Sequence, residues 1–290
     1  MYRRHLILLL ALVLVSCDNS VQTAEELFSL PEKIKESSAV ETIEGFEGIY
    51  TLEDKGNKPQ ILAVDLQGQL VSTIAITNAE NNDWEDLTSD EKGNLYIGDF
   101  GNNDNERKNL AIYKIAAADL NKPKAAVAET ISFYYPEQVL FPPKKSERFY
   151  DVEAFFMFND HFYLFTKNRS SKFDGTTFLY KIPNKPGRHP AKLVDSFKTC
   201  DNFKSCAITS ADVSRDGKRM VLLSSNKVWL FSHFPGNQFL SGKVQVINLG
   251  SDTQKEGVCF ADDETLYVTD EKNKKAGGKL YELKVSKSKS

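Results

Sequence analysis

Residues 82–103 read NDWEDLTSDEKGNLYIGDFGNN, and this stretch contains the pattern that decides the fold. An acidic residue begins a short apolar segment, a polar turn follows it, and a second apolar segment comes after the turn. The acidic phrase recurs along the chain, and its five copies are residues 35–38, 84–87, 152–155, 210–213 and 255–258. Repetition at intervals of tens of residues is typical of architectures whose copies stack to bury their faces.

The apolar segments are short, alternate with polar residues, and are rich in Val, Ile, Tyr and Phe. Helical periodicity is confined to residues 116–120, so the pattern predicts an all-β chain. Third strands are expected at 110–115, 178–182, 227–231 and 279–285, and fourth strands at 130–135, 192–197 and 243–249. The first unit would use 36–40, 48–52, 60–66 and 70–76. Four antiparallel strands repeated radially form the blade of a β-propeller.

Counting the acidic phrases predicts five blades in a single domain, residues 25–290. The last unit ends after its third strand, and residues 25–30 are expected to supply the missing fourth. Such a ring has no unpaired sheet edge. Six blades are the alternative, because residues 136–150 and 183–209 are long enough to contain further strands.

The first seventeen residues have the pattern of a signal peptide. Arg3 and Arg4 precede an apolar run at 6–15, which is too short to span a bilayer. The closing Leu14-Val15-Ser16-Cys17 resembles a bacterial lipobox, which implies cleavage before Cys17 and its diacylation; the alternative is an ordinary secretory signal. We therefore expect a lipoprotein of the bacterial cell envelope, exported and held on a membrane by its lipid, with residues 18–24 as tether. Which membrane carries it stays open.

The net charge and the cysteines limit the classes of partner and the disulfides that the chain can have. The chain has 37 Lys and Arg against 40 Asp and Glu, for a formal net charge of −3, which argues against nucleic acid as a partner. After export, Cys200 and Cys206 either form a disulfide around a small loop or stay free thiols together with Cys259.

Propeller topology predicts where the polar groups gather. The first strand of each blade begins at the rim where the second strand ends, so the polar loops after the second strands meet the acidic phrases there. The shared position is occupied by Glu36, Glu85, Glu153, Ala211 and Glu256, with Asp86 and Asp212 one step on. Carboxylates so close together must take up protons, engage cationic neighbours or bind cations.

We expect calcium at this rim, held by Glu36, Glu85, Glu153, Glu256 and Asn102, because calcium prefers several oxygen ligands in a flexible shell. The competing interpretation is structural, with the same residues capping the channel through backbone groups and water. Lys167 and Arg169 would hold an anionic group of a ligand or neutralise Glu153. The expected ligand-binding set also includes Trp84, Asp99 and Asn103; core packing between blades is the alternative for Trp84.

The phrases at 82–87, 95–103 and 110–113, with Gly56-Asn57-Lys58-Pro59, 151–154, 212–217 and 256–258, resemble a family of exported bacterial β-propeller proteins of poorly defined activity. The likeness covers most of the mature chain. More distantly, the chain is similar to esterase-like and phytase-like propellers and to calcium-dependent lactonases and phosphotriesterases. That resemblance implies calcium ligands at Glu36, Glu85, Glu153 and Glu256, with Asn102 as a fifth. The chain departs from it at Ala211 and lacks the histidine dyad of the lactonases.

The sequence thus predicts a membrane-anchored, calcium-containing binding module that recognises an extracytoplasmic ligand or protein at its acidic rim. A calcium-dependent hydrolase of phosphate esters or lactones is the alternative; if the protein is an enzyme, metal-assisted hydrolysis is the class that the residues allow. A scaffold subunit of an envelope complex is the second alternative.

Overall fold

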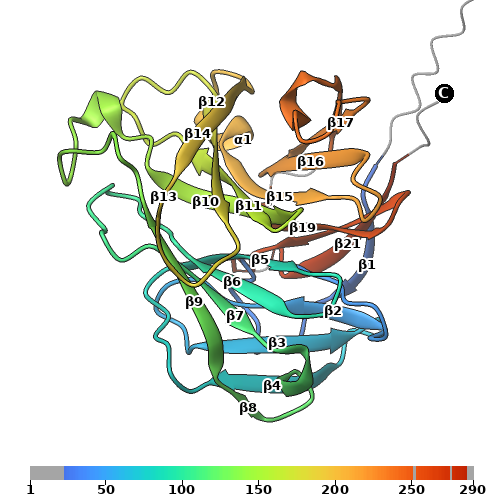
Figure 1. Ribbon diagram of the computed structural model, residues 1–290. Helices are drawn as coiled ribbons and strands as arrows, with labels where there is room; N and C mark the ends of the chain where they lie inside the picture. Colours follow the sequence, from blue (N-terminus) through green and yellow to red (C-terminus); the bar gives the residue numbers. More distant parts are fainter. Residues whose placement is uncertain (1–22, 251–252, 275, 286–290) are drawn as a thin grey trace, which may run out of the picture.

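The computed structural model describes residues 23–250, 253–274 and 276–285; the predicted signal peptide, Cys17 and most of the tether lie outside them. Five sheets form the blades of a β-propeller (Figure 1). Blade 1 contains β2 (Gly48–Thr51), β3 (Gln60–Asp65), β4 (Leu70–Ile76) and β8 (Lys124–Ala125). Blade 2 contains β5 (Trp84–Ser89), β6 (Leu95–Asp99), β7 (Ala111–Ile115), β9 (Val127–Tyr134) and β13 (Gly187–Pro190).

Blade 3 contains β10 (Asp151–Phe158), β11 (His161–Lys167), β12 (Thr176–Pro183) and β14 (Lys192–Lys198). Blade 4 contains β15 (Ile208–Val213), β16 (Arg219–Ser224), β17 (Lys227–Ser232) and β18 (Lys243–Asn248). Blade 5 contains β19 (Lys255–Asp262), β20 (Thr265–Asp270), β21 (Lys279–Lys284) and β1 (Glu25–Ser29). The five-blade prediction is confirmed.

Both ends of the described chain contribute to blade 5. Strand β1, blue in Figure 1, pairs antiparallel with β21, which is red, and Ser29 lies opposite Lys279. Closure by an N-terminal strand is therefore confirmed. Strand β21 begins with Lys279 at the rim where β20 ends. Its partner Ser29 therefore lies at that rim, and Glu25, at the start of β1, lies at the opposite face of the ring.

Three segments differ from the predicted strands. Residues 36–40 form no regular strand; isolated bridges at Ser37 and Glu41 join this segment to blade 1 instead. Strands β8 and β13 pair in parallel with β4 and β9, so the outer edges of blades 1 and 2 depart from a purely antiparallel order. Residues 183–209 contribute β13, β14 and the short helix α1 (Phe203–Cys206) rather than a sixth blade. In the described part of the chain, no helix is long and apolar enough to cross a membrane.

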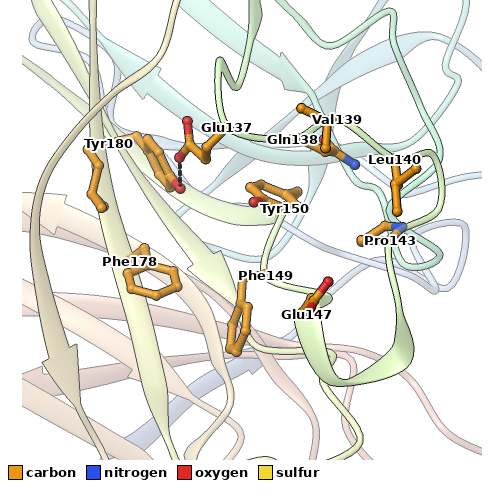
Figure 2. A pocket seen from close by; sticks show the side chains of 11 residues that line it. Glu137, Gln138, Val139, Leu140, Pro143, Glu147, Phe149, Tyr150, Phe178 and Tyr180 are labelled. Carbon is orange, nitrogen blue, oxygen red and sulfur yellow. Dashed lines mark hydrogen bonds between the residues drawn. The ribbon is translucent and has the colours of Figure 1, made fainter.

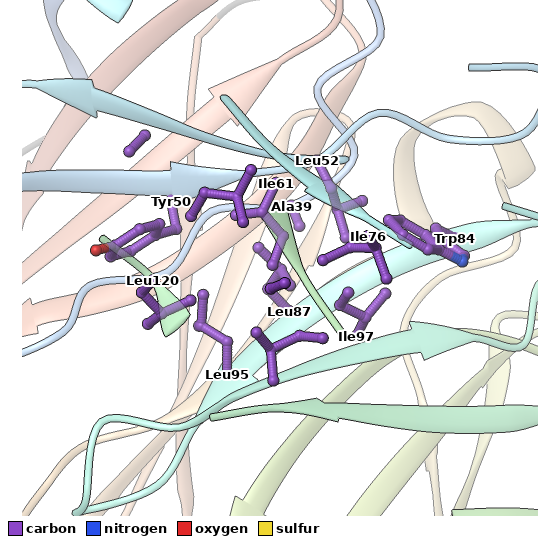
Figure 3. Packing of buried hydrophobic residues seen from close by; sticks show 14 residues of the cluster. Ala39, Tyr50, Leu52, Ile61, Ile76, Trp84, Leu87, Leu95, Ile97 and Leu120 are labelled. Carbon is purple, nitrogen blue, oxygen red and sulfur yellow. The ribbon is translucent and has the colours of Figure 1, made fainter. Parts of the chain in front are cut away.

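Apolar side chains fill the spaces between neighbouring blades. Trp84 shows how this works: its ring is fully buried among Leu52, Ile76 and Ile97, between blades 1 and 2 (Figure 3). Its Nε1 donates to the carbonyl of Glu80 at 3.1 Å, which satisfies the one polar atom of the indole. Burying such a side chain contributes about 2–3 kcal/mol and helps to fix one blade against the next.

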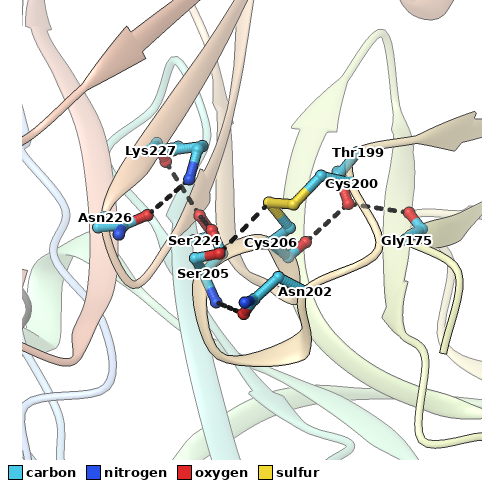
Figure 4. The surroundings of a disulfide bond; sticks show 9 residues. All are labelled: Gly175, Thr199, Cys200, Asn202, Ser205, Cys206, Ser224, Asn226 and Lys227. Carbon is cyan, nitrogen blue, oxygen red and sulfur yellow. Dashed lines mark hydrogen bonds between the residues drawn. A yellow bond between two sulfur atoms is a disulfide. The ribbon is translucent and has the colours of Figure 1, made fainter.

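Cys200 and Cys206 are joined in a disulfide beside α1, with their Cα atoms 5.6 Å apart. Asn202 caps the helix by accepting from the backbone N–H of Ser205, and Thr199 Oγ1 donates to the carbonyl oxygens of Gly175 and Cys206 (Figure 4). The bridge closes the loop that leads into the inner strand of blade 4. Cys259 is a free, buried thiol.

Candidate functional site

The inner strands β5, β10 and β19 begin at the rim where the second strands of their blades end. Register pairs fix this arrangement, with Trp84 opposite Asp99, Asp151 opposite Lys167, and Lys255 opposite Asp270. The side chains at this rim form a cluster that we call the acidic mouth. Its members are Glu36, Asp54, Lys55, Asp83, Glu85, Asp151, Glu153, Lys167, Arg169, Glu256 and Glu271.

A β-bulge places the acidic residue in the inner strands of blades 2, 3 and 5. The strand pairing shifts register at Glu85 and Glu256 after the first pair of their blades and at Glu153 after the second pair of blade 3; in blade 4 it shifts at Thr209. Bulges turn a side chain away from the regular alternation of a strand. The predicted alignment of Ala211 with the three glutamates is therefore wrong by two residues, because a bulge leaves no mark in the hydrophobic pattern.

Hydroxyl groups occupy the corresponding positions of blades 1 and 4. Thr209 Oγ1 donates to the carbonyl of Lys255, and Ser38 Oγ donates in the same way to the carbonyl of Trp84. Each hydroxyl thus binds the first residue of the next inner strand. Glu36 comes two residues before Ser38 and is exposed. It therefore does not occupy the position that corresponds to the bulged residues of the other blades.

Two cations neutralise the acids of blade 3. Arg169 donates from Nε to Asp151 and from Nη2 to Glu153, both at 2.5 Å, and Lys167 Nζ donates to Glu153 at 2.9 Å. Burial raises the pKa of Glu153, but Lys167 and Arg169 outweigh burial and hold that pKa below its usual value. Burial and the neighbouring Glu153 raise the pKa of Asp151 to about 7. Lys167 and Arg169 therefore neutralise Glu153, which is one of the two roles predicted for them.

Glu85 and Asp83 converge on Gly101. A Cβ at Gly101 would lie 2.0 Å from Glu85 Oε1 and 2.9 Å from Asp83 Oδ2, so a larger residue at this position would force both carboxylates to move. Burial, followed by Glu153 and Asp151, raises the pKa of Glu85 well above its ordinary value. Lys55 is the cation nearest Asp83, at 3.8 Å, and its own side chain is 65% exposed.

Four further carboxylates, from blades 1 and 5, form no close ion pair in the described residues, although Lys167 acts at longer range on Glu256 and Glu271. Burial and Glu36 raise the pKa of Asp54 to about 7, while burial and Glu256 raise that of Glu271 to about 8. Glu36 Oε2 accepts from Asn57 Nδ2 and Glu256 Oε1 from Gln254 Nε2, each at 2.6 Å. Within the described residues, none of these four acids has a lysine, arginine or histidine nitrogen within 4.0 Å.

The other predicted site residues have structural partners or are solvent-exposed. Trp84 does not line the mouth, because it is completely buried in the core. Asp99 is also fully buried and accepts hydrogen bonds from Asn82, Arg107 and Tyr113. Asn102 donates to the carbonyl of Tyr150 and accepts from the backbone N–H of Arg107. Asn103, in contrast, is exposed on the loop beside them.

The predicted calcium ligands are not arranged as a calcium coordination shell. Both oxygens of Glu153 bind cationic side chains, both polar side-chain atoms of Asn102 bind the backbone, and Lys167 brings an ammonium group to the centre of the acids. Across residues 23–250, 253–274 and 276–285, no three His, Cys, Asp or Glu side chains are arranged to hold a metal ion. The residues present therefore do not fit a preformed calcium centre.

The predicted site residues did not include Asp54, Asp83, Asp151 or Glu271. Asp54 and Glu271 lie in or next to the polar loops expected at this rim, so loop composition was the available signal. Asp151 immediately precedes the acidic phrase of blade 3. Its role appears only once Arg169, eighteen residues later, folds back onto it.

The comparisons with known proteins support the fold. No protein-family profile and no curated protein match the sequence. The chain is similar to a glucose dehydrogenase structure at a TM-score of 0.51, with 7% identity over 92% of this chain and 100% of the other. A putative gluconolactonase gives a TM-score of 0.49, with 9% identity over 91% and 92% of the two chains.

Virginiamycin B lyase from Staphylococcus aureus gives a TM-score of 0.42 with 13% identity over 86% of this chain. The match spans 66% of the lyase, just under two thirds of its length. At 7% identity the likeness to the glucose dehydrogenase structure concerns the fold alone and shows nothing about chemistry.

Proposed function

We propose that this protein is an extracytoplasmic binding module that takes a cationic group of a ligand or protein partner at the acidic mouth. The observation that carries the proposal is the set Glu36, Asp54, Glu256 and Glu271, four carboxylates without a paired cation in the described residues. Burial and the neighbouring acids disfavour the charged forms of Asp54, Glu256 and Glu271. A bound cation would offset this effect, so binding energy is available at this place.

Membrane attachment through Cys17 stays part of the proposal. Strand β1 begins at Glu25 on the face opposite the mouth, so a tether entering there would direct the mouth away from the membrane. A Cys17→Ala variant should lose incorporation of a labelled fatty acid and leave the membrane fraction. Unchanged labelling of that variant would contradict the lipid anchor.

An ionic titration tests the mouth itself. We expect spermidine to bind saturably by calorimetry at pH 8 and low salt, and binding to weaken as salt rises. Calcium chloride, with chelator as its control, tests in parallel the metal predicted from the sequence. Glu271→Gln should lower the spermidine affinity several-fold, whereas Glu91→Gln, an exposed residue in the hairpin at the other face, should not. The proposal would be contradicted if neither spermidine nor calcium bound saturably. It would also be contradicted if Glu271→Gln and Glu91→Gln changed the spermidine affinity equally.

The hydrolase alternative gains no support from the carboxyl pair of blade 3. Asp151, whose pKa lies near 7, would be the natural proton donor or acceptor, but it is completely buried. One of its oxygens accepts from Arg169 and the other from the backbone N–H of Asn102. A general acid or base must reach its substrate within hydrogen-bonding distance. Binding is therefore the function that the geometry favours.

A further inference from the structure

A pocket of about 290 Å³ lies outside the acidic mouth, between residues 137–150 and the outer strands of blade 3. Four aromatic side chains line it, Phe149 and Tyr150 from the loop and Phe178 and Tyr180 from β12. Figure 2 shows the rings of Phe149, Tyr150 and Phe178 around the same space. Neither the fold nor the proposed function requires such a pocket.

The aromatic walls are held in place by their neighbours. The rings of Phe149 and Phe178 meet edge to face, with centroids 5.3 Å apart. Tyr135, buried behind the pocket, packs against Tyr150 at 5.0 Å and against Tyr180 at 4.7 Å. Rings fixed in this way need little ordering when a ligand binds, so less entropy is lost on association.

Two carboxylates stand at the edges of the same pocket. Glu137 Oε1 accepts a hydrogen bond from the hydroxyl of Tyr180 at 2.6 Å, which fixes its position. Glu147 lines another part of the pocket. Its ion pair with Lys144 is long, at 3.8 Å, and the lysine side chain is 75% exposed. A neutral apolar ligand would gain nothing from these charges. An anionic ligand would be repelled by them.

We propose that this pocket binds a small alkylammonium ion. The faces of aromatic rings carry negative potential and attract cations, most strongly where water is excluded, and aromatic cages recognise quaternary ammonium groups in this way. Glu137 and Glu147 add charge of the complementary sign. The exposed aliphatic side chains of Leu140 and Leu193 contact the remainder of the pocket and would cover the alkyl part of the ligand.

The test compares choline with 3,3-dimethyl-1-butanol, which has the same shape without the charge, by calorimetry on the mature protein at physiological salt. We expect saturable binding of choline and at least about tenfold weaker binding of the neutral analogue. Glu137→Gln, a near-isosteric change at an exposed residue, should weaken choline binding several-fold, as should Phe178→Leu. Circular dichroism establishes that both variants are folded.

The exposed Glu91→Gln is the control and should leave choline binding unchanged, while Glu137→Gln should leave the affinity for spermidine at the acidic mouth unchanged, which separates this pocket from the proposed function. Equal affinities for choline and its neutral analogue would overturn the proposal. So would choline binding that survives both pocket variants, or the absence of choline binding at tens of millimolar.

Discussion

Ser210 of blade 4 donates a hydrogen bond to Asp86 of blade 2 across the central channel, at 3.2 Å to Oδ2 and 3.3 Å to Oδ1. Both residues are fully buried. Asp86 also accepts from the backbone N–H of Phe155 in blade 3, and Ser210 Oγ accepts from that of Val258 in blade 5. One carboxylate and one hydroxyl thus join the inner strands of four blades. They close the channel one residue beyond the glutamates of the mouth.

Removing this carboxylate should destabilise the ring. Asp86→Ala leaves the N–H groups of Phe155 and Leu87 without their acceptor at a fully buried position, at a cost of about 2–4 kcal/mol in the free energy of unfolding. Urea unfolding followed by fluorescence measures the change. Asp263→Ala, in an exposed turn, serves as the control and should change stability by less than about 0.5 kcal/mol. Similar values for the two variants would contradict the central role of Asp86.

Arg169 should be required to keep two carboxylates ionised in the protein interior. Asp151 and Glu153 expose 0% and 4% of their side chains, so Arg169→Ala leaves poorly compensated charge and should cost about 3 kcal/mol at pH 8. At pH 5 the loss should be smaller, because protonation then removes the charge. Unfolding of wild type and variant at both pH values measures this, with the exposed Arg188→Ala as control. A loss that does not depend on pH would contradict this account.

Stability should fall as pH rises from about 5 to 8. Burial and neighbouring acids raise the pKa of Glu271 to about 8 and that of Asp54 to about 7. In this range the folded chain keeps protons that the unfolded chain has already released, so raising the pH favours unfolding. Glu271→Gln should flatten the dependence of melting temperature on pH, while Glu91→Gln should not. A steeper slope in Glu271→Gln would reverse the expected sign.

The same titrations affect ligand binding. Because Asp54 and Glu271 lose protons between about pH 5 and 8, affinity for spermidine should increase over that range. Calorimetry at three pH values measures it. Affinity that stays constant with pH would separate the ligand from these carboxylates.

The Cys200–Cys206 disulfide should contribute about 2 kcal/mol, a modest value because the loop that it closes is short. Reduction should lower the melting temperature without unfolding the propeller at room temperature. Alkylation of the denatured protein, mapped by peptide mass, should label Cys259 alone when reductant is absent and all three of these cysteines when it is present. Labelling of Cys200 without reductant would show that the bridge does not form.

Much of the fold follows from local patterns. Alternating apolar residues, turns such as Asp90–Asn94 and the recurrence of the acidic phrase predicted blades, their number and the closure by residues 25–30. These features are readable because hydrophobic alternation and turn preference depend on residues close in sequence. Where the chain departs from regular pairing, the prediction failed: residues 36–40 satisfy their backbone groups through isolated bridges and form no regular strand.

The sequence predicted where the candidate site lies, but it predicted much less well which side chains bind one another there. Topology alone brings Glu85, Glu153 and Glu256 to one rim, as expected. Trp84 was assigned to that rim as well, yet it turns into the core because its neighbours are apolar and its Nε1 finds the carbonyl of Glu80.

The sequence by itself determined the repeating unit, the five-fold ring and the concentration of acids on one face, since each depends on local composition and spacing. Only the tertiary structure decided which acids are neutralised. Arg169 binds Asp151 and Glu153, while Glu36 and Glu271 meet from opposite ends of the chain without a paired cation. The physical reason is that an ion pair depends on distances of a few ångströms. Bulges and loop paths, which leave no periodic trace in the sequence, set those distances.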